Sequence, residues 1–68
     1  MKMLVIDKPS LRLTPRNFCI YDQRRRGHMK YHEIAKCHGI TTERSRQIYH
    51  IMERLYLRGY FHYENIEK

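Results

Sequence analysis

Apolar positions recur at helical spacing on both sides of Gly39, and this is the clearest hydrophobic pattern in the chain. Before the glycine, residues 30–38 place four residues on one helical face, namely Tyr31, Ile34, Ala35 and His38. Glycine readily adopts the left-handed conformation that ends a helix, and Thr41 can cap the helix that follows. Lys30 replaces the usual capping residue type, so the first of these helices is expected to be poorly capped. The pattern predicts helices over residues 30–38 and 42–58, joined by a tight turn.

The helix predicted over residues 42–58 sorts its residues onto two opposed faces when each residue advances by about 100°. One face is polar and consists of Glu43, Arg46, Gln47, His50 and Arg54. The opposite face consists of Thr41, Ser45, Ile48, Met52 and Leu55. We expect the second face to enter a core and the first to meet a polar partner.

A further helix is predicted over residues 14–26. At its start, Thr14 can cap the helix and Pro15 suits the first helical position. Leu13 and Phe18 have the spacing of a hydrophobic staple. Gly27 is expected to end it. The last turn holds Arg24, Arg25 and Arg26, which either complement the helix dipole or contact phosphate. The sequence leaves both roles open.

Both ends of the chain carry β-prone segments, at residues 3–6 and 60–63. The second segment either pairs with the first as a short two-stranded wing or folds back over the core as an irregular cap. The expected fold class is therefore mainly α: a single three-helix helix-turn-helix domain over residues 1–68, with the wing as one of two options for its ends.

The charge balance indicates a polyanionic partner. Fourteen Lys and Arg residues against seven Asp and Glu residues give a net charge of +7 on 68 residues, and such a field favours nucleic acid. A membrane surface competes, but the chain has no run of about 18 apolar residues and no signal-peptide pattern. We therefore expect a soluble, cytoplasmic protein without membrane contact. A core this small hides only roughly 60% of the unfolded surface, which favours marginal stability or a dimer.

Other chemistry finds little support in the sequence. Cys19 and Cys37 are expected to be reduced and to act as small apolar residues. His28 and His32 lie one helical turn apart, yet their spacing to the cysteines matches no zinc module. No nucleophile–base pair or glycine-rich phosphate loop is present. We expect no metal, no cofactor and no enzymatic activity.

Residues 13–57 resemble region four of the bacterial primary sigma factors, the domain that recognises the promoter −35 element. The resemblance lies in residues 13–16 (LTPR), residues 33–36 (EIAK) and, most specifically, residues 41–48 (TTERSRQI). The last segment is similar to the family motif T-R-E-R-[IV]-R-Q-I, which it matches at Glu43, Arg44, Arg46, Gln47 and Ile48. The resemblance implies that Glu43 and Gln47 approach base edges and that Arg46 contacts phosphate or base.

Three departures limit what the resemblance implies. Thr42 stands where the family has a guanine-reading arginine, so the base preference should differ from that of a −35 element. Ser45 replaces a buried Ile or Val, and its hydroxyl is expected to form a hydrogen bond to the backbone. Lys30 replaces a capping Thr. All other sigma regions are absent, so the resemblance implies a stand-alone small transcription regulator.

We therefore expect sequence-specific binding of double-stranded DNA, with the helix over residues 42–58 in the major groove. Arg46 can pair with guanine, Gln47 with adenine, and Glu43 can accept from cytosine. The candidate DNA-binding residues are Thr42, Glu43, Arg44, Arg46, Gln47, His50, Arg54, Lys30 and Arg25. The wider set for phosphate contact is Arg16, Arg24, Arg25, Lys30, Lys36, Arg44 and Arg54.

Two questions about partners stay open at this point. A homodimer on a palindromic site is the usual remedy for a single recognition helix. The aromatic residues that offer a dimer contact, or equally close the core, are Tyr56, Tyr60, Phe61 and Tyr63. The alternative function is a protein-interaction module that binds RNA polymerase or another transcription factor. RNA is a weaker option, since no stacking signature is present.

Overall fold

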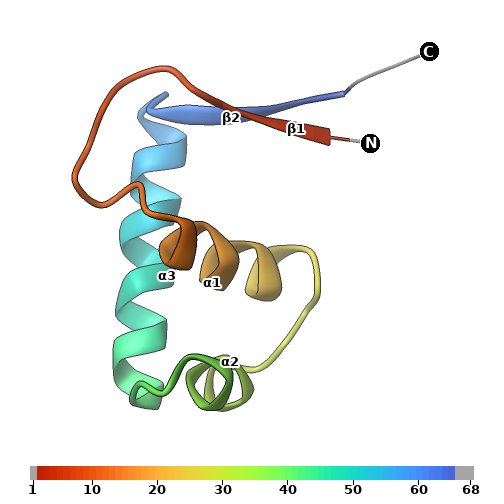
Figure 1. Cartoon of the computed structure of the whole chain (residues 1–68), viewed down its shortest axis with the longest axis vertical. Coiled ribbons are helices and arrows are strands. Elements are labelled where there is room, and N and C mark those ends of the chain that lie inside the picture. Colours follow the sequence, from red (N-terminus) through yellow and green to blue (C-terminus); the bar gives the residue numbers. More distant parts are fainter. Residues whose placement is uncertain (1, 66–68) are drawn as a thin grey trace.

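The computed structural model describes residues 2–65 and contains three helices and a two-stranded sheet (Figure 1). In chain order the elements are β1 (Lys2–Ile6), α1 (Pro15–Arg25), α2 (Tyr31–His38), α3 (Thr42–Leu57) and β2 (Phe61–Asn65). The mainly α fold class is confirmed, and each helix end lies within one residue of its predicted bound. Within residues 2–65, no helix combines the length and the apolar character needed to cross a bilayer.

The two ends of the chain pair as an antiparallel sheet, which decides between the two options for the C-terminal aromatic segment. Leu4 lies opposite Tyr63, Val5 opposite His62, and Ile6 opposite Phe61. β2 also closes the core, because Phe61 is fully buried and Tyr63 packs against the core, as does Leu4 of β1. The strand and the core-closing cap are therefore the same segment.

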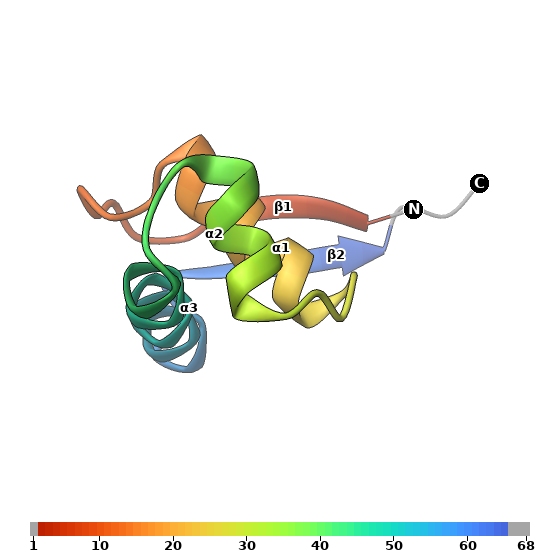
Figure 2. The same cartoon turned by 90° about the horizontal axis from the view of Figure 1, so that it is seen from below.

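The core lies where α3 packs against both α1 and α2. Figure 2 shows α3 nearly end-on, with α1 and α2 together on one side of it. Among the described residues, the buried apolar side chains are Ile20, Tyr21, Ile34, Ala35, Ile48, Met52 and Phe61. Phe61 extends this core toward the sheet, since its ring meets that of Phe18 edge-on at a centroid distance of 5.1 Å.

The start of α1 follows the sequence signals, whereas its end does not depend on Gly27 in the expected way. Thr14 Oγ1 accepts a hydrogen bond from the Asn17 backbone N–H at 3.3 Å, as a capping threonine does. The helix ends at Arg25, and the left-handed residue that follows is His28, with φ of 54°. A Cβ at Gly27 would lie 2.9 Å from the Gln23 carbonyl oxygen, so close backbone approach explains this glycine.

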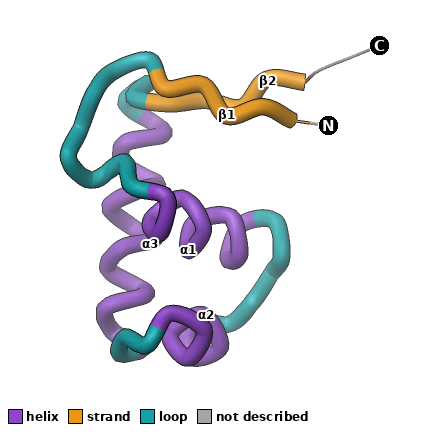
Figure 3. The backbone as a smooth tube through the Cα atoms, viewed as in Figure 1, coloured by secondary structure: helices purple, strands orange, loops and turns teal. Residues whose placement is uncertain are grey.

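The capping of α2 corrects one prediction and confirms another. The Lys30 side chain adds no cap, but the Glu33 carboxylate accepts from the Lys30 backbone N–H at 3.0 Å, so the helix start is better satisfied than expected. Gly39 ends the helix with φ of 66°, as predicted. Thr41 Oγ1 then accepts from the Arg44 N–H at 3.1 Å and begins α3. This turn is short, whereas longer loops join β1 to α1 and α1 to α2 (Figure 3).

Candidate nucleic-acid interface

The outward face of α3 is exposed along its whole predicted length. Glu43, Arg46, Gln47, His50 and Arg54 are all exposed. On the opposite face Ser45, Ile48 and Met52 are buried and Leu55 is half-buried, while Thr41 is exposed and acts as the N-cap. The two-faced helix is therefore confirmed, except that Thr41 does not enter the core. The cause is its position one residue before the helix, where its side chain serves the backbone.

A buried serine holds the start of α3 against the start of α2. The Ser45 hydroxyl lies 2.7 Å from the Thr42 carbonyl oxygen and 3.0 Å from the Tyr31 carbonyl oxygen. Its single proton serves one acceptor at a time, and both are backbone groups, which confirms the expectation of a backbone hydrogen bond at this position. The contact with Tyr31 links α2 to the second turn of α3 and fixes their spacing.

A polar cluster connects the middle of α3 to the end of α1. The Tyr21 hydroxyl donates to Glu53 Oε1 at 2.6 Å, and the Tyr49 hydroxyl lies 3.3 Å from Glu53 Oε2. Arg25 Nη1 donates to the Tyr21 hydroxyl at 2.5 Å and lies 3.5 Å from Glu53 Oε1. Burial, followed by the hydrogen bond to Glu53, raises the pKa of Tyr21 well above its usual range. This cluster holds α3 against α1 and so helps to fix which face of α3 points outward.

The role of Glu53 was not predicted from the sequence. The available signal was its spacing, because Glu53 follows Tyr49 by four residues and precedes Tyr56 by three, which places it beside both rings on a helix. Its partners on α1 are 28 and 32 residues away in sequence. Local periodicity does not reveal such a contact.

Arg24 and Arg25, at the end of α1, make contacts with other parts of the fold. Arg24 donates to the Met29 carbonyl at 3.1 Å, and its guanidinium lies 4.6 Å from the centre of the Tyr31 ring. The Arg25 guanidinium lies 4.6 Å from the centre of the Tyr56 ring, in addition to its contacts with Tyr21 and Glu53. These arginines do more than complement the helix dipole. DNA contact by Arg25, whose side chain is 41% exposed, stays a prediction.

Two of the predicted base-reading residues contact each other. Arg46 Nε donates to Glu43 Oε1 at 3.2 Å, and Arg46 Nη2 pairs with the other carboxylate oxygen of Glu43. Hydrogen bonding from Arg46 holds the pKa of the Glu43 carboxyl below its usual range. The pair lies one helical turn apart in the first turns of α3, and both side chains are substantially exposed.

The remaining candidates surround the start of α3. Thr42 and Arg44 are exposed in its first turn, and Lys30 is exposed at the start of α2, which Ser45 ties to α3. A shallow hollow of about 280 Å³ on the outward face is lined by Arg46, Gln47, His50, Ile51 and Arg54. The predicted residues on α3 and Lys30 are therefore all exposed, and four of them line this hollow.

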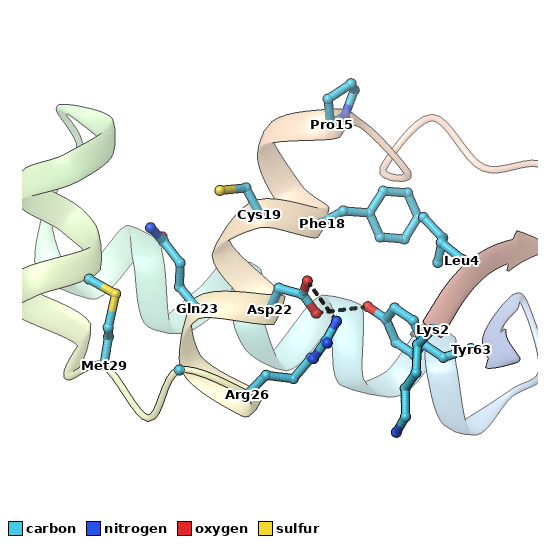
Figure 4. Close-up of a pocket in the computed structure, with 11 residues that line it drawn as sticks. Lys2, Leu4, Pro15, Phe18, Cys19, Asp22, Gln23, Arg26, Met29 and Tyr63 are labelled. Atoms are coloured by element: carbon cyan, nitrogen blue, oxygen red, sulfur yellow. Dashed lines mark hydrogen bonds and ion pairs between the residues drawn. The ribbon is translucent and has the colours of Figure 1, made fainter. Parts of the chain in front are cut away.

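A second and larger hollow, of about 830 Å³, lies between α1 and the sheet (Figure 4). Asp22 accepts there from the Tyr63 hydroxyl at 3.3 Å and pairs with Arg26 at 3.5 Å. Burial raises the pKa of Tyr63 to about 12. Cys19, which also lines this hollow, is exposed, as is Cys37, and neither is bonded in a disulfide.

No metal site emerges in the part of the chain that the structure describes. Residues 2–65 contain no group of three His, Cys, Asp or Glu side chains placed to hold an ion. His28 and His32 are both exposed.

Comparison of the chain with protein-family models, with curated proteins and with solved structures found no match. The resemblance to sigma region four therefore stays a prediction that depends on the residues themselves.

Proposed function

We propose that the protein binds double-stranded DNA and inserts α3 into the major groove as the second helix of a helix-turn-helix. The observation that carries this proposal is the exposed outward face of α3, which presents Glu43, Arg46, Gln47, His50 and Arg54 on a chain with a net charge of +7. An α-helix fits the major groove, and each base pair presents a distinct pattern of donors and acceptors there.

The proposed contacts divide into base readout and phosphate positioning. Gln47 has the amide geometry that pairs with adenine, and Arg46 has the donors that pair with guanine. Lys30 and Arg44 lie beside the start of α3 and are proposed to contact phosphates on either side of the groove. Phosphate contacts of this kind fix the register of the helix without reading sequence.

The sheet takes the role of a brace in this proposal rather than that of a DNA-contacting wing. It follows the C-terminal end of α3, whereas Glu43 and Arg46 lie at the other end of the helix (Figure 1). A helix of 16 residues is about 24 Å long, so the sheet is well separated from the proposed base contacts.

We further propose that the protein regulates transcription, in keeping with its resemblance to sigma region four in residues 41–48. A homodimer on a two-fold symmetric site belongs to the same proposal. Of the aromatic residues that could close the core or make a dimer contact, Phe61 is fully buried in the single chain, whereas Tyr56, Tyr60 and Tyr63 are half-buried against the same core and keep part of their surface exposed.

Selection from random duplex DNA, read at low and moderate salt, tests the proposal. We expect one enriched motif, and an affinity that falls steeply with salt as about 0.9 counterions are released for each phosphate neutralised. A palindromic motif supports the dimer. No enrichment at either salt concentration contradicts the proposed function.

A protein partner is the second candidate, and two exposed leucines favour it. Leu11 is 99% exposed and Leu57 is 75% exposed, and apolar side chains of this size suit a protein surface better than a phosphate backbone. A partner such as RNA polymerase, engaged through these residues, should bind with little dependence on salt. Loss of that binding in Leu57→Ser, with DNA affinity unchanged, would identify this function.

A further inference from the structure

The contact between Glu43 and Arg46 bears on which of the two reads a base. Arg46 grips Glu43 with two parallel hydrogen bonds, from Nε and Nη2 to the two carboxylate oxygens. This fork geometry is the one that guanidinium and carboxylate groups prefer, and it fixes the plane of the guanidinium. Both carboxylate oxygens of Glu43 are therefore engaged by its neighbour.

The two hydrogen bonds to Glu43 leave the outer edge of the Arg46 guanidinium available. A guanidinium carries five N–H donors, one on Nε and two on each terminal nitrogen. Two of the five point at Glu43, and the three others, on Nη1 and Nη2, include one pair along the edge remote from Nε. That pair matches the two acceptors, O6 and N7, that guanine presents in the major groove. One arginine can thus hold Glu43 and guanine at the same time.

The charges of Glu43 and Arg46 also favour a contact between the two side chains near DNA. A carboxylate in the first turn of α3 benefits from the helix dipole, but it would repel the phosphates on either side of a groove. Pairing with Arg46 neutralises it locally. An arginine held by a carboxylate also loses less side-chain freedom on binding than a flexible one, which favours a directed contact.

We infer that Glu43 is a positioning residue, which orients Arg46 to read guanine and does not itself accept from cytosine. This inference rests on the proposed DNA-binding function. The DNA duplex bound by this part of the interface should therefore have a guanine opposite the second turn of α3. Two independent base contacts at Glu43 and Arg46 are thereby replaced by a single coupled one.

Duplex selection with the parent chain, Glu43→Gln, Arg46→Ala and the double variant tests the inference. Glu43→Gln keeps the shape of the side chain but removes the charge that holds Arg46. We expect Glu43→Gln and Arg46→Ala to reduce preference for guanine at the same base pair, each by about fivefold or more. The double variant should lose no more than Arg46→Ala alone.

Glu64→Gln is the matched control, because it removes the same charge at an exposed position on β2, which follows the end of α3 opposite to Glu43. It should leave the selected motif unchanged. Loss of preference for cytosine at a different base pair in Glu43→Gln, additive with Arg46→Ala, overturns the inference and leaves the proposed function in place. A parent chain that enriches no motif overturns both.

Without DNA, the pair is tested by titrating the Glu43 carboxyl in carbon-detected NMR spectra. The pKa of Glu43 should rise in Arg46→Ala relative to the parent chain. An unchanged pKa shows that the pair does not form in solution and also overturns the inference.

Discussion

Tyr21→Phe should destabilise the protein by deleting one hydroxyl at the junction of α1 and α3. The hydroxyl donates to Glu53 Oε1 at 2.6 Å and accepts from Arg25 Nη1 at 2.5 Å, while the ring itself is fully buried and keeps its packing in the variant. The change therefore isolates two hydrogen bonds to charged groups. Each such bond contributes about 1.5 to 3 kcal/mol to stability.

The expected loss is smaller than the sum because water can reach both partners. The side chains of Arg25 and Glu53 are 41% and 32% exposed, so hydration and their remaining mutual contact compensate in part. We expect the free energy of unfolding to fall by about 1 to 2 kcal/mol. The total stability of a domain of this size is roughly 3 to 10 kcal/mol, so the loss is readily measured.

Urea unfolding followed by far-UV circular dichroism measures this loss, with Glu53→Gln and the double variant completing a mutant cycle. The coupling energy should be about 1 kcal/mol, since the two groups are in direct contact. Tyr60→Phe is the matched control, because it deletes the same hydroxyl from a half-buried ring outside this cluster. A loss below about 0.3 kcal/mol in Tyr21→Phe, or a coupling energy near zero, would refute the role of this cluster in holding α3.

Three further predictions concern the core, the turn and the sheet. Ile48→Ala should cost about 2 to 5 kcal/mol in urea unfolding, because this side chain is 2% exposed, and an unchanged midpoint would contradict its burial. Gly39→Ala should lower Tm through its φ of 66°, at a cost of about 1 kcal/mol, and an equal or higher Tm would show that the turn is not left-handed. Hydrogen bonds to Glu64 and Asp7 raise the pKa of His62, so its stabilising contribution should be present below about pH 6.5 and be lost as pH rises through the folded-state pKa. Tm should therefore fall more between about pH 5.5 and about pH 8.5 in the parent than in His62→Gln, and equal falls would show that the His62 contacts do not stabilise the sheet.

The elements and the two faces of α3 could be predicted from the sequence because they depend on local rules. Helical periodicity, the capping residue Thr41 and the left-handed Gly39 act within a few residues of one another, and each was observed as expected. The hydrogen bond from the Lys30 backbone N–H to Glu33 is also local, but it was not predicted, because it does not depend on the side chain at position 30.

Contacts between distant elements could not be predicted in the same way. The role of Arg25 depends on Glu53 and Tyr56, which α3 brings to the end of α1 only in the folded chain. The sequence showed that the Arg25 guanidinium lies at a helix end. This position agrees equally well with an interaction with the helix dipole and with contact to a phosphate. Similarly, Glu43 and Arg46 were predicted to lie on the outward face of α3. Two residues on the same face can each contact a ligand, or they can contact each other. Only side-chain geometry distinguishes these cases.

A comparison of two arginine variants decides whether the outward face of α3 reads duplex DNA. Arg46→Ala and Arg26→Ala remove the same charge, the first from this face and the second from the hollow between α1 and the sheet. The measurement is the ratio of affinities for the selected duplex and for a scrambled one. This ratio should fall about fivefold or more in Arg46→Ala and stay at the parent value in Arg26→Ala. Equal ratios in both variants and the parent would show that this face of α3 does not read DNA sequence.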